Sequence, residues 1–158
     1  MAETVQVVSF KLGSEEYGVE IAQVQEINRM VAVTHVPRAP QFMEGVINLR
    51  GQLIPIIDLR TRFGMQRAEH TKNTRIVVTE IGAKRVGMVV DSVSEVLRLP
   101  VDAIEDAPDM ITGVDTEYIR GVGKIEDRLI ILLDLAKIIT GAEKRELEAA
   151  DVDAVPVG

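Results

Sequence analysis

The chain has 158 residues, a length that fits one domain or two small halves packed together. Hydrophobic residues make up 46%, which is enough for a buried core, while the net charge of −7 disfavours binding to nucleic acid or to anionic lipid. The absence of cysteine excludes disulfides, thiolate metal sites and thiol nucleophiles. The N-terminal residues do not resemble a signal peptide and no apolar run could span a membrane, so we expect a cytoplasmic protein without direct membrane contact.

Alternating apolar residues predict a mainly β protein from the N-terminus onward. Residues 5–12 place Val8, Phe10 and Leu12 on one face of a strand that Gly13 ends. The same alternation recurs in two further segments, at Tyr17, Val19 and Ile21 and at Ile76 and Val78. Short strands separated by turn residues favour small barrels over a parallel α/β sheet.

The predicted helices are short and capped. Asp58 is a good N-cap for residues 59–63, and Gly64 is a good residue to end that helix. The same arrangement recurs with Asp134, residues 135–140 and Gly141. Each Asp cap would stabilise its helix by about 1 kcal/mol. Pro55 lacks the N–H that a central strand needs, so it is expected at an edge or a bulge.

The chain contains an internal duplication. Four blocks of the first half recur in the second half in the same order, the first two at one displacement and the last two at a slightly larger one. The blocks begin at Tyr17 and Val86, at Val24 and Val93, at Phe42 and Tyr118, and at Leu53 and Leu129. The short insertion that enlarges the displacement is expected near the acidic stretch 102–117. Two similar halves are predicted within a single domain, 1–158.

The predicted boundaries follow from these repeats. Residues 14–70 would form the first barrel and residues 71–141 the second, while the strand 5–12 can pair with either. A helix and a loose tail are expected over 142–158.

Candidate catalytic and ligand sites are weakly supported. Gly121-Val122-Gly123-Lys124 is interpreted as a glycine turn, because a phosphate loop needs Ser or Thr where Ile125 stands. The acidic stretch lacks the ligand spacing of a calcium loop, and His35 and His70 have no triad-like context. The sequence therefore predicts no cofactor, no metal site and no enzymatic activity.

Two charged residues stand among apolar neighbours. Arg50 lies in the apolar segment 46–54, and Glu26 lies between Val24 and Ile27. A charge in such surroundings needs a partner or water. We therefore predict a Glu26–Arg50 ion pair that leaves Val24 and Ile27 available to a partner.

The sequence contains a series of recognisable motifs: Phe10-x-Leu12-Gly13-x-x-x-Tyr17-Gly18, Val24-Gln25-Glu26-Ile27, Pro37-x-x-Pro40, Gly45-Val46-Ile47-Asn48-Leu49-Arg50-Gly51, Gly87-Met88-Val89-Val90-Asp91-x-Val93, Ile119-x-Gly121 and Leu132-Leu133-Asp134. From about residue 5 to residue 141, these motifs resemble those of CheW-type coupling proteins of bacterial chemotaxis. The Asn-Leu-Arg-Gly block with the Pro-x-Ile-x-Asp-Leu that follows it is the most specific.

The resemblance implies two SH3-like five-stranded β-barrels packed on a shared core, with short helices and a C-terminal helix. It also implies a non-catalytic adaptor that couples the cytoplasmic tip of methyl-accepting chemoreceptors to the regulatory C-terminal domain of the CheA-type histidine kinase, in receptor arrays at the membrane. Carried over to this sequence, Val24, Glu26, Ile27 and Arg50 would line a receptor groove between the barrels. The kinase-contacting residues carry no comparable motif.

Three alternatives stay open at this point. The chain could be an adaptor of a related chemosensory pathway, an enzyme with an acidic site, or a module that binds a small molecule between its barrels. A cleft with converging carboxylates would favour the enzyme. A ligand retained through purification would favour the binding module.

Overall fold

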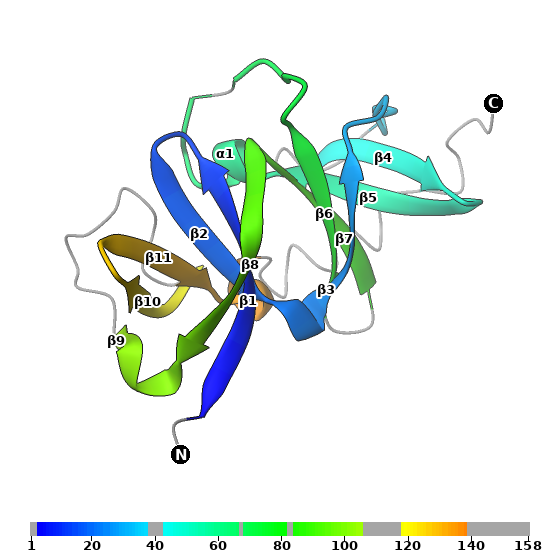
Figure 1. Cartoon of the computed structure of the whole chain (residues 1–158). Helices are drawn as coiled ribbons and strands as arrows, with labels where there is room; N and C mark the ends of the chain where they lie inside the picture. The colour runs from blue at the N-terminus through cyan, green and yellow to red at the C-terminus, as the bar shows by residue number, and fades with distance from the viewer. Residues whose placement is uncertain (1–2, 38–42, 67, 82–83, 106–117, 139–158) are drawn as a thin grey trace.

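The computed structural model describes residues 3–37, 43–66, 68–81, 84–105 and 118–138. Its strands and short helices run along the chain as β1 (Thr4–Leu12), β2 (Glu15–Glu20), the 3-10 turn Ile21–Gln23, β3 (Val24–Arg29), β4 (Met43–Leu49), β5 (Gln52–Asp58), α1 (Leu59–Arg62), β6 (Arg75–Ile81), β7 (Lys84–Val90), β8 (Ser92–Pro100), the 3-10 turn Val101–Ala103, β9 (Ile104–Glu105), β10 (Ile119–Ile125), β11 (Arg128–Leu133) and α2 (Leu135–Ile138). Figure 1 shows them as two groups of strands side by side. The prediction of a mainly β protein with brief helices is confirmed, while the expected C-terminal helix falls outside the described residues.

The strands form two mixed sheets that each curl into a barrel. Barrel I has the order β3-β6-β7-β5-β4, and barrel II has the order β8-β1-β2-β11-β10-β9. Barrel I closes where Thr34, beyond the end of β3, exchanges two backbone hydrogen bonds of 2.8 Å with Val46 of β4. Barrel II closes in the same way through β9, which pairs with β10. The short strand β9 is an addition to the five strands expected in barrel II.

The barrel boundaries differ from those predicted. The strands β3 to β7 build barrel I, whereas barrel II combines β1 and β2 with β8 to β11. Each half of the chain thus contributes its first two strands to the other half's barrel, so the division at residues 14–70 and 71–141 is wrong. The physical reason is that the links from β2 to β3 and from β7 to β8 carry the chain from one barrel into the other. Alternation along a strand does not reveal its pairing partner.

The duplication is confirmed by the strand registers. Pairs in β1–β2 correspond to pairs in β6–β7 at the displacement of the early sequence blocks, and pairs in the hairpins β4–β5 and β10–β11 correspond at that of the later blocks. The matched pairs are Phe10↔Tyr17 with Thr79↔Val86, and Asn48↔Leu53 with Lys124↔Leu129. The parallel pair Gly18↔Leu132 likewise corresponds to Gly87↔Ile56. The two barrels are therefore copies of one pattern that differ in their surface residues.

The largest apolar cluster lies between the barrels and uses residues of both. Val8, Phe10 and Leu12 of β1 contribute from barrel II, and Val77 and Met88 contribute from barrel I. Each barrel also has its own interior cluster. β1 directs Val7 into barrel II and Val8 into the shared cluster, so both of its faces are buried. The predicted shared core is thus present, and it holds the two barrels together.

Three local expectations prove wrong. Pro55 lies inside β5, which pairs with β4 on one side and β7 on the other. Its missing N–H is tolerated because Val46, the residue opposite it on β4, forms its backbone hydrogen bonds with Thr34. On the other side, the parallel pairing with β7 begins one residue later, at Ile56. The Gly121–Lys124 segment lies within β10 and is no turn. Its glycines admit close neighbours, since a Cβ on Gly121 would lie 2.9 Å from the carbonyl oxygen of Glu105. Ile21 belongs to a 3-10 turn and is exposed.

Both Asp caps are confirmed. The Asp58 carboxylate accepts a hydrogen bond of 2.9 Å from the Arg60 N–H, and the Asp134 carboxylate accepts one of 3.1 Å from the Ala136 N–H. Gly64 ends α1 in the left-handed region, with φ 75°.

We expect Asp58→Ala to lower the free energy of unfolding by about 1 to 2 kcal/mol, and Asp134→Ala to lower it by less. Asp58 is buried and Asp134 is only half-buried, so only the first substitution leaves the helix N-terminus without water. Urea unfolding of both variants measures the difference. Equal losses would contradict the role of burial.

Candidate partner-binding site

The predicted ion pair between Glu26 and Arg50 is present in the structure. Glu26 lies on β3 and Arg50 lies in the turn of the β4–β5 hairpin, so the pair joins the two edges of the sheet that closes barrel I. The Arg50 side chain is 70% exposed and that of Glu26 is 26% exposed. An exposed pair of this kind contributes only about 0 to 1 kcal/mol to folding. Its main effect is to hold a guanidinium and a carboxylate at a fixed place on the surface.

The hairpin turn presents Arg50 through an unusual backbone conformation. Arg50 and Gly51 have φ values of 51° and 82°, as in the two-residue turns that match strand twist. The Asn48 side chain accepts a hydrogen bond of 2.9 Å from the Gly51 N–H. In barrel II the corresponding residue, Glu126, also has φ 51°. The positive φ of the first turn residue is therefore retained while its charge is reversed, whereas the second residue is Gly51 with φ 82° in barrel I and Asp127, without a positive φ, in barrel II.

The two apolar candidates differ in exposure. Val24 is half-buried against the shared core, so much of its side chain serves packing. Ile27 is 40% exposed and is one of the larger apolar side chains on the described surface. Alternation along β3 places Gln25, Ile27 and Arg29 at exposed positions, and Glu26 at a half-buried one. The structure thus brings Glu26 and Arg50 into contact, whereas Ile27, the next residue along β3, projects from the opposite face of the strand.

Barrel II carries a different charge arrangement at the corresponding place. Arg128 of β11 forms ion pairs with Glu16 and with Glu95, the latter at 2.6 Å. Glu95 corresponds to Glu26, so the repeated glutamate is paired in both barrels, but with an arginine from a different position. Burial raises the pKa of Glu16, but the hydrogen bonds from Arg128 and Ser9, together with the positive charges of Arg128 and Lys11, outweigh it and hold that pKa below its ordinary value. Sequence reasoning missed this cluster because its members are far apart in the chain.

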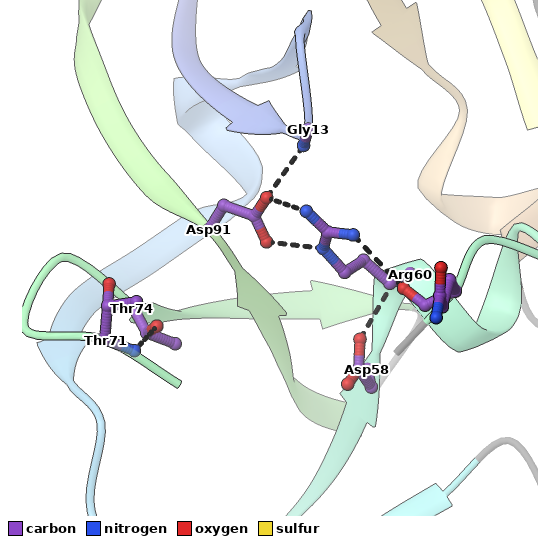
Figure 2. Close-up of polar contacts among 7 residues, drawn as sticks. Gly13, Asp58, Arg60, Thr71, Thr74 and Asp91 are labelled. Carbon is purple, nitrogen blue, oxygen red and sulfur yellow. Dashed lines mark hydrogen bonds and ion pairs between the residues drawn. The ribbon is translucent and has the colours of Figure 1, made fainter. Parts of the chain in front are cut away.

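A second cluster missed by sequence reasoning links the barrels. Arg60 of α1 donates from Nε to Asp91 at 2.8 Å and from its terminal nitrogen at 2.5 Å, and the Gly13 N–H donates to the same carboxylate at 2.7 Å (Figure 2). Gly13 lies in the β1–β2 turn of barrel II, whereas Asp91 is the single residue between β7 and β8. The hydrogen bonds from Arg60, and then that from Gly13, lower the pKa of Asp91, while Asp91 raises the pKa of Arg60. We call these three residues the inter-barrel clamp.

The described ranges show no cluster of three or more His, Cys, Asp or Glu residues that could hold a metal ion. Within the same ranges, no helix is long and apolar enough to cross a membrane.

Fold and surface together define a duplicated β-protein of two packed barrels with an ordered charge pair on one of them. The CheW-like domain family model matches residues 6–143. The chain belongs to the CheW-like family. The chemotaxis protein CheW of Klebsiella aerogenes is 43% identical over 134 residues, covering 85% of this chain and 81% of that protein. The probable chemotaxis protein CheW of Rhizobium etli is 36% identical over 138 residues, covering 87% and 89%.

A solved structure supports the same fold. The scaffolding protein TtCheW from Thermoanaerobacter tengcongensis superposes with a TM-score of 0.81 at 36% identity, covering 90% of this chain and 92% of that one. The predicted fold class, two SH3-like barrels packed on a shared core, is confirmed. The resemblance seen in the sequence is likewise confirmed over almost the whole chain.

Proposed function

We propose that the protein is a non-catalytic adaptor of chemotaxis signalling, which couples methyl-accepting chemoreceptors to the regulatory C-terminal domain of the CheA-type histidine kinase. The observation that carries this proposal is the near full-length match to chemotaxis CheW proteins and to a scaffolding protein of the same fold. We place the protein in the cytoplasm, at receptor arrays on the membrane. No cofactor takes part in this function.

We further propose that Val24, Glu26, Ile27 and Arg50 contact the receptor's helical tip. The ordered ion pair and the exposed Ile27 side chain on the other face of the same strand support this assignment, because protein interfaces combine apolar contacts with a polar rim. A pair this exposed contributes little to folding stability, which also supports a role for it in partner binding.

A calorimetric titration against the kinase regulatory domain from the same organism tests the adaptor role. We expect one-to-one binding with a Kd of about 1 µM or tighter, as for a specific protein interface of standard size. No binding between two proteins that are both shown to be folded would overturn the proposal.

The receptor site is tested by Arg50→Asp. Aspartate tolerates the left-handed backbone at this position, so the turn is retained while the charge is reversed. We expect receptor-tip binding to weaken by about 1 to 3 kcal/mol, or about 5- to 150-fold, because two carboxylates then face the partner. The melting temperature should change little.

Glu126→Lys is the matched control, since it reverses the charge at the corresponding turn of barrel II. It should leave receptor affinity unchanged. An Arg50→Asp protein with normal receptor affinity and a clearly lower melting temperature would assign the ion pair to folding alone.

A further inference from the structure

A basic hollow lies at one end of barrel I, where β3 ends and β6 begins. Its volume is about 470 Å³, and it is lined by Arg29, Met30 and residues 71–75. Lys72 and Arg75 belong to that segment, so the lining carries three cationic side chains and no carboxylate. This is an unusual concentration of positive charge in a chain of net charge −7.

Two of these cations face each other across the sheet. Arg29 and Arg75 form a directly opposed pair in the β3–β6 ladder, and like charges in that position are destabilising. Arg75 donates hydrogen bonds of 2.8 and 2.9 Å to the carbonyl oxygens of Lys72 and Thr74, which hold its guanidinium in place. Over the described parts of the chain, no carboxylate forms an ion pair with Arg29, Lys72 or Arg75.

The duplication shows that the fold does not require this opposed pair. The pair at the corresponding register position of barrel II is Arg98 opposite Gln6. This position therefore accepts a neutral residue opposite arginine. Barrel I has a second arginine instead, at a cost in stability that an anionic partner would offset.

The turn beside the hollow indicates which kind of anion fits. The Thr71 N–H donates to the Thr74 hydroxyl at 2.8 Å (Figure 2), and the Thr74 N–H donates to the Thr71 carbonyl oxygen at 3.2 Å. The Asn73 N–H donates to the Thr71 hydroxyl at 3.1 Å. These amides are used within the turn, so they form no cradle of the kind that binds phosphate tightly. Three spread cationic side chains instead suit several carboxylates on one chain segment.

We propose that this hollow binds a carboxylate-rich segment of the protein partner that contacts the Glu26–Arg50 site. Arg29 and Ile27 occupy exposed alternate positions on one face of β3, so the hollow adjoins the Ile27 part of the surface proposed for the receptor. The assignment of the partner rests on the proposed function. The charge of the hollow does not.

In the first test, hexaglutamate peptide is titrated into the full chain at low ionic strength, and binding is measured by NMR. Wild-type protein should bind it with amide shifts at residues 71–75. Arg75→Gln, which recreates the barrel II pair, should weaken binding about two- to fivefold and raise the melting temperature by about 1 °C through relief of repulsion. The matched control Arg98→Gln should change neither quantity.

Equal peptide binding by wild type and Arg75→Gln would overturn the proposal. Tighter binding of inorganic phosphate than of hexaglutamate would overturn the ligand class.

The second test measures receptor-tip and kinase-domain affinity of Arg75→Gln at two salt concentrations. We expect receptor-tip affinity to fall, with a weaker salt dependence than that of wild type, and kinase-domain affinity to stay unchanged. Unchanged receptor-tip affinity would overturn the partner assignment. If wild type binds neither protein, the proposed function fails, and the hexaglutamate result still decides whether the hollow takes carboxylates.

Discussion

Gly45→Ala is expected to lower the free energy of unfolding by more than about 3 kcal/mol, because it forces a side chain into a place already filled. A Cβ on Gly45 would lie 2.3 Å from the Thr34 carbonyl oxygen and 2.7 Å from a Val33 methyl carbon. That carbonyl accepts the Val46 N–H in the bridge that closes barrel I. The substitution therefore pushes apart the two segments that complete the barrel.

Two other glycines make the comparison specific. Gly121, the counterpart of Gly45, has its nearest neighbours at 2.9 Å, so Gly121→Ala should cost less. Gly51 has open space around it but a φ of 82°, so Gly51→Ala should cost only about 1 kcal/mol of backbone strain. Chemical denaturation of the three variants gives the order. A loss at Gly45 no larger than at Gly51 would contradict a steric role for Gly45.

Asp91→Ala is expected to lower the free energy of unfolding by about 2 kcal/mol at neutral pH, because it removes the acceptor of the inter-barrel clamp. The Arg60 guanidinium, whose side chain is 19% exposed, then loses its carboxylate, and the Gly13 N–H loses its acceptor. The clamp joins α1, the β1–β2 turn and the β7–β8 link, so its loss acts on the relative position of the barrels. Thermal unfolding and hydrogen exchange at Gly13 measure the effect.

The pH dependence provides a check on the cause. The folded state holds the pKa of Asp91 below its ordinary value of 3.8, so the stabilisation is present above that pH and is lost as the pH falls through the folded pKa. The difference between wild type and Asp91→Ala should therefore narrow as the solution is acidified below about pH 4. Asp127→Ala, an exposed carboxylate in the β10–β11 turn, is the control and should follow wild type throughout. A difference independent of pH would point to packing rather than charge.

The sequence alone determined the features that depend on local pattern or on comparison of the two halves. Alternating apolar residues predicted the strands β1 and β6, and the Asp and Gly residues predicted the helix α1 and the start of α2. The repeats identified the hairpins that present Arg50 and Glu126. The Glu26–Arg50 pair could be predicted as well, because each is a charge in an apolar segment and each needs a counter-charge.

Only the tertiary structure decided which strands share a barrel and which distant charges meet. β1 and β6 are apolar on both faces, so their sequences fit either barrel, and the choice depends on partners across the shared core. Tertiary contacts also decided the position of Pro55 inside a paired strand, the contact between Arg60 and Asp91, and the opposed pair of Arg29 and Arg75. The physical reason is that periodicity reports which face of a strand is buried, whereas strand pairing depends on contacts between segments far apart in the chain.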